Sequence, residues 1–379
     1  MNKQKILIFI DWFAPGFKAG GPTTSNMNII EHLKDKFDFY VVTTDTDYHE
    51  SKPYQNILSD RWTKQNGFSV YYFSHRNLSF KTLKRAVEES GCGTWYINGI
   101  YSKYFSVFPL ILAKITHPKC VIVSARGMLS PHALAIKSTA KKGYLIVAKS
   151  LGLFNKVKFH ATNDEEANYI KQVLGAKRKI QSVENLPRKV NLNFFATKKD
   201  NAEVKLVSFA RISSEKNTLY AIECLRYCKE RVVYHIYGQI NSPSYWDECE
   251  QVIKDLPDNV TVEYKGTVSP QEMPNIYKGY HFLFLPSTGE NFGHAILESL
   301  MNSSPVIISD KTPWRYLREK NIGWDLPLDN KQLFYSTIDE CAKLSSKQYE
   351  SMAGRAYQYA KEVRENPLVE QNYINLFTK

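Results

Sequence analysis

The segment 285–301 holds the residues best suited to chemistry. Two glutamates, Glu290 and Glu298, stand eight positions apart with Gly293 between them. A strand, a glycine-containing loop and a helix are predicted here in turn. The first turn of such a helix suits a diphosphate, because its backbone N–H groups are free and the helix dipole favours an anion. If helical rise sets the spacing, the carboxylates lie about 12 Å apart, which suits a ligand with a hydroxylated ring on each side of its phosphates.

A pair of cations follows another predicted strand, 205–210. Arg211 and Lys216 stand five positions apart, so both can converge on one phosphate through charge-assisted hydrogen bonds. The alternative is a surface ion pair with Glu215. For the glutamates, the alternatives are a helix N-terminal charge at Glu290 and a solvated side chain at Glu298, although the apolar sequence around Glu298 argues against the second.

These two segments resemble the signature of the family 4 retaining glycosyltransferases. Residues 285–301 are similar to the family's E-x7-E element, and residues 209–217 to its G-R-x-x-x-E-K-N element, with Ala210 in place of glycine. The resemblance implies the GT-B fold, in which two Rossmann-like α/β domains face a central cleft. It also implies a hexosyltransferase that moves a sugar from a nucleotide-diphosphate donor to an acceptor hydroxyl with retention, without a metal ion or other cofactor.

The resemblance extends to other donor-binding positions. Residues 11–22 resemble the family's (F/Y)-x-P-x-x-G-G element, whose glycines let backbone amides approach phosphate and sugar. Residues 235–238 and 265–268 resemble its next two strand ends, which wall the base and ribose. The implied donor-binding residues are Gly20, Gly21, Arg211, Lys216, Gly238, Gly266, Val268, Asn291, Phe292, Gly293, His294 and Glu298.

Two segments resemble a bacterial branch of the family that builds surface polysaccharides such as O-antigen, capsule or exopolysaccharide. They are 124–134, similar to H-G-M-L-x-P-W-A-L, and 312–317. Arg126 and His132 replace that element's histidine and tryptophan. We take both, with Glu290, as catalytic candidates; a helix cap or a surface position is the alternative for His132.

Three further segments have assigned roles. Asn98 is an acceptor-side candidate, because relatives place a short polar turn there. Residues 160–166 predict a helix N-cap at Thr162 or Asn163 with acidic first-turn residues, which is a structural role. Residues 366–377 resemble the family's closing helix.

Short apolar runs alternate with longer helical patterns along the whole chain, which predicts parallel sheets built from βαβ units. The polar, proline-marked stretch 184–201 places the domain link. We therefore predict an acceptor-binding Rossmann-like domain over 1–190 and a nucleotide-sugar-binding one over 191–365. The closing helix, 366–379, is expected to return to the first domain.

Charge and composition bear on partners and location. The chain has 379 residues and a net charge of +12. Residues 1–190 carry 28 Lys and Arg against 14 Asp and Glu, whereas residues 191–379 carry 22 against 24, so the first half predicts an anionic partner. The six scattered cysteines do not form a disulfide framework. The first apolar run is too short for a signal peptide, and no stretch reaches the roughly 20 residues of a membrane span. We expect a cytoplasmic protein.

The stretch 137–158 combines lysines with apolar residues and contains no acidic residue. Its lysines are Lys137, Lys141, Lys142, Lys149, Lys156 and Lys158. Such a basic amphipathic element favours peripheral association with the anionic inner face of the membrane, where relatives use a lipid-linked glycan acceptor. The alternative is that its apolar face packs into the core and its lysines are merely solvated.

Two other functions remain as alternatives. A nucleotide-sugar epimerase shares the GT-B architecture, but no set of acid/base residues beside a sugar C2 stands out. A nucleic-acid-binding protein fits the basic first half, but the lysines are scattered and lack interleaved aromatic residues; we expect no nucleic-acid partner.

Overall fold

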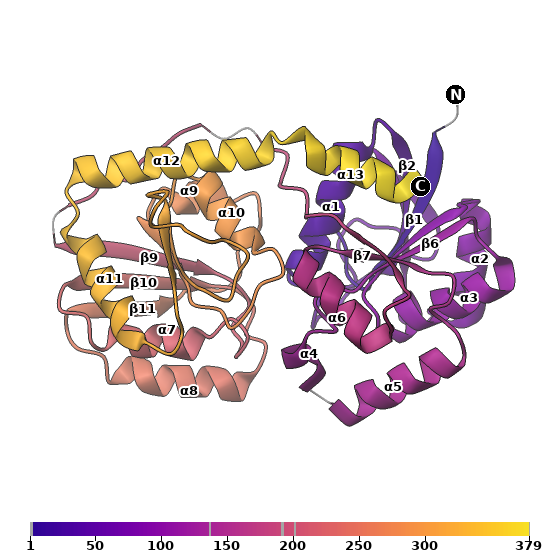
Figure 1. Ribbon diagram of the computed structural model, residues 1–379, viewed down its shortest axis with the longest axis horizontal. Coiled ribbons are helices and arrows are strands. Elements are labelled where there is room, and N and C mark those ends of the chain that lie inside the picture. Colours follow the sequence, from indigo (N-terminus) through magenta and orange to yellow (C-terminus); the bar gives the residue numbers. More distant parts are fainter. Residues whose placement is uncertain (1–2, 136–137, 191–192, 201, 379) are drawn as a thin grey trace. The chain divides into compact units, whose positions relative to one another are not determined.

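The computed structural model describes residues 3–135, 138–190, 193–200 and 202–378, without the side chain of His132. The chain divides into two compact units (Figure 1). Unit 1 contains residues 1–189 and 366–379, and unit 2 contains residues 190–365. The sequence predicts boundaries at 190/191 and 365/366, and the units divide at 189/190 and 365/366.

Unit 1 is built on an eight-stranded sheet with the order β3-β4-β2-β1-β5-β6-β7-β8. Neighbouring strands are parallel except β3, which runs antiparallel to β4. The strands are β1 (Gln4–Phe9), β2 (Phe37–Thr44), β3 (Trp62–Gln65), β4 (Phe68–Phe73), β5 (Thr94–Asn98), β6 (Cys120–Ser124), β7 (Lys158–Ala161) and β8 (Lys179–Ser182). The chain leaves β1 toward β2 on one side and later fills β5 on the other, so the topological switch point, where open α/β sheets bind ligands, lies between β1 and β5.

Helices cover this sheet. They are α1 (Gly21–Leu33), α2 (Phe80–Ser90), the π-helical turn η1 (Lys103–Val107), α3 (Phe108–Thr116), α4 (Pro131–Ala135), α5 (Ser138–Ser150), α6 (Asp164–Leu174) and α13 (Pro367–Thr378). The closing helix α13 belongs to this unit, because the Phe377 ring packs 5.6 Å from Phe37 and 5.7 Å from Tyr96. Helix α6 has the predicted N-cap: Asn163 Oδ1 accepts the Glu166 N–H at 2.8 Å.

Unit 2 is built on a six-stranded parallel sheet with the order β11-β10-β9-β12-β13-β14. The strands are β9 (Glu203–Phe209), β10 (Arg231–Tyr237), β11 (Val260–Tyr264), β12 (Phe282–Leu285), β13 (Val306–Ser309) and β14 (Gly323–Leu326). The helices are α7 (Thr218–Leu225), α8 (Pro243–Lys254), α9 (Met273–Tyr277), α10 (His294–Met301), α11 (Lys331–Lys343) and α12 (Ser346–Arg364). The switch point of this sheet lies between β9 and β12. Strand β12 is buried along its whole length, as its unbroken apolar sequence predicts.

Candidate active site

In unit 2 the loops after β9 and β12 meet at the switch point. The Thr288 N–H donates to Glu215 O at 2.9 Å, and Asn217 Nδ2 donates to Pro286 O at 3.0 Å. These bonds join the segment of the two cations to the segment of the two glutamates. The two motifs identified separately in the sequence thus form one site edge.

An ion pair lies at the centre of this edge. Lys216 Nζ is 2.6 Å from Glu290 Oε1, with the side chains 20% and 10% exposed. Arg211 instead approaches Glu215, with 3.6 Å between Nη2 and Oε2. The alternative of an ion pair with Glu215 therefore describes Arg211 but not Lys216. In this state Glu290 binds Lys216, the cation that the sequence assigns to the donor phosphate.

Helix α10 presents an open N-terminus beside this pair. Its N-cap, Gly293, has φ +79°, no side chain caps the first turn, and no acidic residue lies in it. The Trp314 indole N–H donates to Phe292 O, which fixes the entry loop. The helix begins at His294, so Glu290 lies in the loop before it. The 12 Å spacing expected from helical rise therefore does not apply to Glu290 and Glu298.

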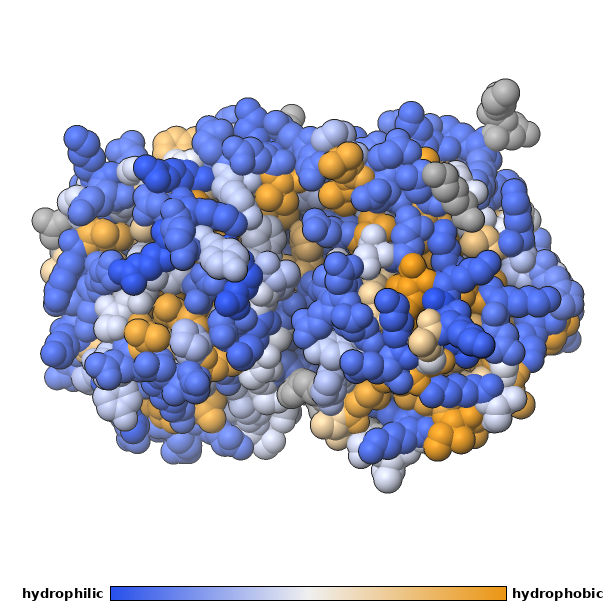
Figure 2. All heavy atoms as spheres, viewed as in Figure 1, coloured by the Kyte–Doolittle hydropathy of each residue, from blue (hydrophilic) through white to orange (hydrophobic). Residues whose placement is uncertain are grey.

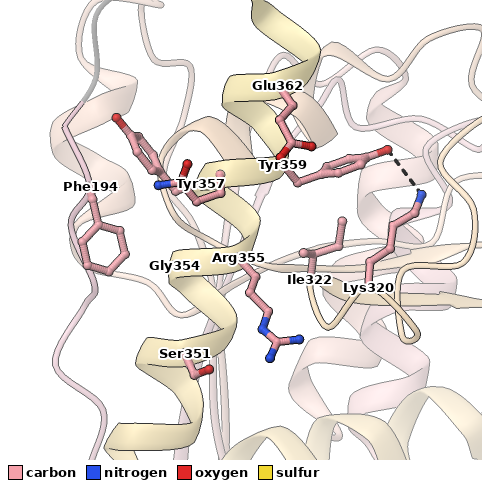
Figure 3. A pocket seen from close by; sticks show the side chains of 10 residues that line it. Phe194, Lys320, Ile322, Ser351, Gly354, Arg355, Tyr357, Tyr359 and Glu362 are labelled. Carbon is pink, nitrogen blue, oxygen red and sulfur yellow. Dashed lines mark hydrogen bonds between the residues drawn. The ribbon is translucent and has the colours of Figure 1, made fainter.

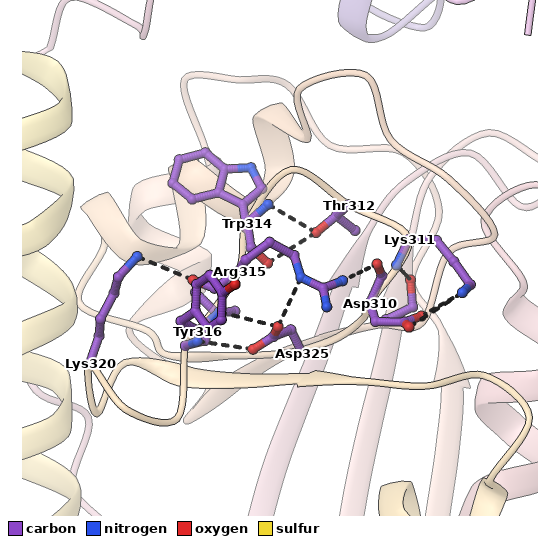
Figure 4. Close-up of polar contacts among 10 residues, drawn as sticks. Asp310, Lys311, Thr312, Trp314, Arg315, Tyr316, Lys320 and Asp325 are labelled. Atoms are coloured by element: carbon purple, nitrogen blue, oxygen red, sulfur yellow. Dashed lines mark hydrogen bonds and ion pairs between the residues drawn. The ribbon is translucent and has the colours of Figure 1, made fainter. Parts of the chain in front are cut away.

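The segment 310–325 supports Trp314 through a polar network (Figure 4). Asp325 accepts the backbone N–H groups of Tyr316 and Leu317 at 3.2 and 2.9 Å, and Arg315 Nε lies 3.3 Å from Asp325 Oδ2. These contacts order the turn that carries Trp314. The element resembling the polysaccharide branch thus supports the α10 entry loop.

Glu298 lies on α10 and is partly buried. Burial, and secondly the charge of Glu298, raise the pKa of the Tyr277 hydroxyl. The Tyr277 ring packs 4.6 Å from Phe209, at the end of β9. Glu298 is therefore more than a solvated helix residue. Of its predicted neighbours, Phe292 is buried, whereas Asn291 and His294 are partly exposed.

The glycines after β10 and β11 lie at the same carboxyl edge of the sheet. A Cβ at Gly238 would lie 1.8 Å from Ala210 O, so close backbone approach alone requires glycine there. The Gly238 N–H donates to Gly266 O at 2.9 Å. Val268 packs against the cluster that contains Phe209. The structure thus brings these positions together with the end of β9, and their contact with a nucleotide stays a prediction.

In unit 1 the predicted glycine loop leads into α1. Gly20 is the N-cap with φ +76°, no side chain caps the helix, and Gly21 is its first residue. Asp47 accepts the Phe17 and Lys18 N–H groups at 3.0 and 3.3 Å, which fixes the loop. An added Cβ at Gly20 would meet no atom within 4 Å, so the space beside it is open. Glycine is therefore favoured here by the positive φ and not by close contacts.

Asn98 and Arg126, predicted from different segments, are in direct contact. Arg126 Nε donates to Asn98 Oδ1 at 2.8 Å, Nη1 to Asn185 Oδ1 at 2.6 Å and Nη2 to Tyr96 Oη at 3.1 Å. Asn26 Nδ2, on α1, donates to the same Asn98 oxygen at 2.9 Å. We name these five residues the Arg126 network; they join the ends of β5 and β6 to α1.

The network continues into the core through His160. Its Nε2 lies 2.8 Å from Val183 O and must carry the hydrogen, because a carbonyl only accepts. Nδ1 is then the acceptor of the Tyr96 hydroxyl at 2.7 Å. Burial and the charge of Arg126 lower the pKa of His160 to about 3, so the ring is neutral. This residue is structural, as the sequence predicts for 160–166.

Sequence reasoning missed three members of this network, Asn26, Asn185 and Tyr96, and also Asp11. Burial raises the pKa of Asp11, which follows β1 and accepts a hydrogen bond from Ser102 Oγ at 2.6 Å. Asn26, Asn185 and Tyr96 are buried. One signal was available: α1 carries the polar run 23–26 at a position where a helix covering a sheet is expected to be apolar. His132 lies on α4, and its side chain lies outside the described part, so its catalytic role stays a prediction.

A depression of about 550 Å³ lies elsewhere in unit 2, beside α12 (Figure 3). Phe194, Tyr357, Tyr359 and Lys320 line it, and the Lys320 ammonium lies 4.8 Å from the Tyr359 ring centre. It contains none of the predicted site residues. In the described ranges, no group of three or more His, Cys, Asp or Glu side chains is placed to hold a metal ion.

Comparison with known proteins supports this reading of unit 2. Residues 189–359 match the family of group 1 glycosyl transferases, and the protein is a glycosyltransferase enzyme. A search of curated protein sequences gave no match.

Solved structures share the fold over nearly the whole chain. Sucrose-phosphate synthase of Thermosynechococcus elongatus is 13% identical, with a TM-score of 0.72 and coverage of 99% of this chain and 98% of that one. Anabaena HepE in complex with UDP-glucose is 18% identical, with a TM-score of 0.72 and 98% coverage of both chains. WaaG, a glycosyltransferase of lipopolysaccharide biosynthesis, is 12% identical, with a TM-score of 0.65 and 98% and 99% coverage. The fold is GT-B, which confirms the prediction from sequence.

Proposed function

We propose that this protein transfers a hexosyl group from a nucleotide-diphosphate sugar to a hydroxyl of a glycan acceptor, with retention at the anomeric carbon. The observation that carries the proposal is the site edge at the β9/β12 switch point of unit 2. Lys216, Arg211 and the uncapped N-terminus of α10 gather three anion-favouring groups there, beside a glutamate. Among similar structures, HepE is described in complex with UDP-glucose, which supports a donor of this class.

The proposed chemistry is stabilisation of the leaving diphosphate. Arg211 and Lys216 would bind its oxygens, and the α10 N–H groups would donate to it, so that charge developing on the leaving group is matched as the sugar departs. Lys216 must then exchange Glu290 for phosphate. This exchange would release the Glu290 carboxylate toward the sugar hydroxyls, and Glu298 would hold the ribose end. The resemblance implies that the leaving phosphate accepts the acceptor proton on the same face.

A panel of UDP-, GDP-, ADP- and CDP-sugars tests this proposal. A donor that binds only the native state raises the melting temperature of the protein. The product of the best donor with a glycan acceptor is then analysed by NMR, where an α-linked donor must give an α-linked product. Isomerisation of the donor alone would instead identify an epimerase, and no shift with any nucleotide sugar would refute the proposal.

We further propose that the enzyme serves surface-polysaccharide assembly from the cytoplasmic side, with unit 1 against anionic lipid. Helix α5 buries Leu145 and Ala148 but leaves Ile146 and Val147 68% and 54% exposed. Leu151 and Ile115 are also exposed, and Lys114 Nζ donates to Leu151 O at 2.6 Å, which holds these two segments side by side. Orange spheres lie among blue ones in the region of α5 at the lower right of Figure 2.

The α5 patch (Ile115, Ile146, Val147 and Leu151) stays exposed, so the alternative of packing into the core describes only part of the stretch. Packing into the core accounts for part of its apolar face and leaves the patch outside. Lys142, Lys149 and Lys156 of the same stretch are exposed, whereas Lys158 donates to Leu376 O and Lys137 lies outside the described residues. No helix in the described ranges is long and apolar enough to cross a membrane.

Vesicle co-sedimentation tests the membrane proposal. Wild-type protein should pellet with anionic vesicles at low salt, and less as salt rises, because each lysine near the surface contributes about 1 kcal/mol that salt screens. The double variant I146S/V147S should pellet less at every salt concentration, whereas L368S, which changes an equally exposed leucine of unit 1, should behave as wild type. Wild-type protein that stays in the supernatant with anionic vesicles at low salt refutes the idea.

A further inference from the structure

The Arg126 guanidinium is fixed in place by neutral side chains and forms no direct ion pair among the described residues. Its three hydrogen-bond acceptors, on Asn98, Asn185 and Tyr96, are all neutral. No ion pair involves Arg126 within the part of the chain that the structure describes. A cation held this way is costly to keep partly buried, unless an anion from outside the protein matches it.

Two acidic side chains of unit 1, Glu166 and Asp11, form their hydrogen bonds with other groups. Glu166, buried in α6, accepts the Gly127 N–H at 2.6 Å through one oxygen, and the Thr162 N–H and hydroxyl, each at 2.7 Å, through the other. Asp11 accepts the Ser102 hydroxyl. Neither forms an ion pair with Arg126.

The guanidinium still has donors to offer. The contacts use three of its five N–H groups, which leaves one on each terminal nitrogen. Two such groups on one planar fork match the two oxygens of a carboxylate or phosphate. Arg126 is partly exposed, whereas its partners Asn98 and Tyr96 are buried, so the residue lies at the border between the core and solvent.

The surroundings also favour an anion. Asn98 Oδ1 connects the guanidinium to Asn26 of α1, whose N-terminus has no side-chain cap and no acidic residue in its first turn. Arg126 itself has φ 52°, an unfavourable value for a residue with a side chain. The backbone therefore keeps the guanidinium at the end of β6 at an energetic cost.

We propose that Arg126 recognises a carboxylate or phosphate carried by one of the two sugar substrates, so that this enzyme acts on an anionic saccharide. The inference rests on the proposed function. The anion has two possible sources, which the experiment separates: a uronic acid in the donor, or an acidic group on the acceptor. Where the related element has histidine, this chain has a permanent cation.

Calorimetric titration of the full chain with matched ligands tests the proposal. The donor arm compares UDP-glucuronate with UDP-glucose and GDP-mannuronate with GDP-mannose. The acceptor arm compares methyl glucuronide and glucose 6-phosphate with methyl glucoside, on protein saturated with the nucleoside diphosphate that binds. In one arm the anionic member should bind at least about tenfold more tightly, which corresponds to about 1.4 kcal/mol.

Variants attribute that preference. R126Q and R126M should reduce it to near unity. R178Q should retain it, because Arg178 is an equally half-buried arginine of unit 1 that donates to backbone carbonyls. N185A keeps the charge of Arg126 but removes one of its hydrogen bonds, so it should weaken the preference only in part. It replaces the Arg126 variants in the test if circular dichroism shows that they do not fold.

Two results would overturn the proposal. One is a wild-type protein that prefers the anionic ligand in neither arm, and the other is a preference that survives in R126Q. Binding of the nucleoside diphosphate alone is measured in parallel. Its absence would refute the proposed donor site of unit 2, whereas its presence without any preference in the sugar arms would refute only the role of Arg126.

Discussion

At the residue scale, the site edge of unit 2 depends on which partner Lys216 has. Its ammonium contacts Glu290 at 2.6 Å, and both side chains are mostly buried. A charge in such surroundings is costly without a partner. Phosphate and Glu290 are therefore alternative partners for one cation, and the two residues should respond differently to substitution.

We predict that Lys216→Ala weakens binding of the nucleotide sugar by about 10- to 100-fold, the range of one lost charge-assisted hydrogen bond, and that Glu298→Ala also weakens it strongly. Binding is measured by calorimetry, and unchanged circular dichroism shows an intact fold. Lys205→Ala is a matched control, since Lys205 is a surface lysine of β9 paired with Glu203 at 3.6 Å. Normal binding and turnover in both variants would remove the assignment of this site.

Glu290→Ala should reduce turnover more than affinity for the free nucleoside diphosphate. The carboxylate is expected to face the sugar, and its loss frees Lys216 for phosphate. The affinity for nucleoside diphosphate should stay within about threefold of wild type or rise, while kcat falls by more than about tenfold, or about 1.4 kcal/mol. An equal loss of affinity for the diphosphate would contradict this placement.

The buried histidines predict a pH dependence of stability. The folded-state pKa is lowered to about 3 in His160 and to about 4 in His281, in both cases mainly by burial. The unfolded chain binds these protons first, near pH 6.5. Stability is therefore complete above pH 6.5 and falls as the pH drops toward each folded pKa, by about 3 kcal/mol per histidine at pH 4.5.

Urea unfolding between pH 7.5 and 4.5 measures this loss. His160→Gln should be less stable than wild type at pH 7.5 but should lose less stability on acidification. A parallel pair of pH curves would show that His160 does not titrate in this window.

At the element scale, α10 depends on a glycine to begin where it does. At Gly293 the φ of +79° is left-handed, and a Cβ would lie 2.7 Å from Ile296 Cδ1 and 3.2 Å from Trp314 Nε1. The strand–loop–helix order follows from the local sequence. The contact with Trp314 joins segments some twenty residues apart, and only packing brings them together.

Gly293→Ala should destabilise the protein by about 1–3 kcal/mol through strain and contact and should weaken nucleotide binding by tilting the α10 N-terminus. Gly266→Ala is the matched control for stability, because it has φ +78° but no atom within 4 Å of its Cβ. The two variants are compared by urea unfolding. Equal losses would mean that backbone strain alone matters and that Trp314 does not support the loop.

At the scale of the whole molecule, the two units have separate cores. Each hydrophobic cluster of described residues lies wholly within one unit, and the candidate cations and glutamates of the donor site all belong to unit 2. The net charge is +14 over residues 1–190 and −2 over the rest, so the two units also differ in charge.

A fragment of residues 190–365 should therefore fold alone and bind the nucleoside diphosphate within about tenfold of the full chain's affinity, that is within about 1.4 kcal/mol. Its fold is checked by the dispersion of its NMR amide signals, and binding is measured by calorimetry. A folded fragment without affinity would mean that the glycine loop of unit 1 supplies most of the binding energy.

The sequence alone determined the parallel α/β architecture, most strand and helix positions, and the two motifs at the unit 2 switch point. Periodicity and strand–loop–helix order are local properties, and the carboxyl ends of parallel strands must share one edge of the sheet. Only the tertiary structure decided the partners of the side chains. It paired Lys216 with Glu290 and gave Arg126 three neutral hydrogen-bond acceptors, on Asn98, Asn185 and Tyr96. It also left Ile146 and Val147 exposed on a helix whose pattern allowed their burial. Such choices depend on contacts between residues far apart in the chain, about which local sequence carries almost no information.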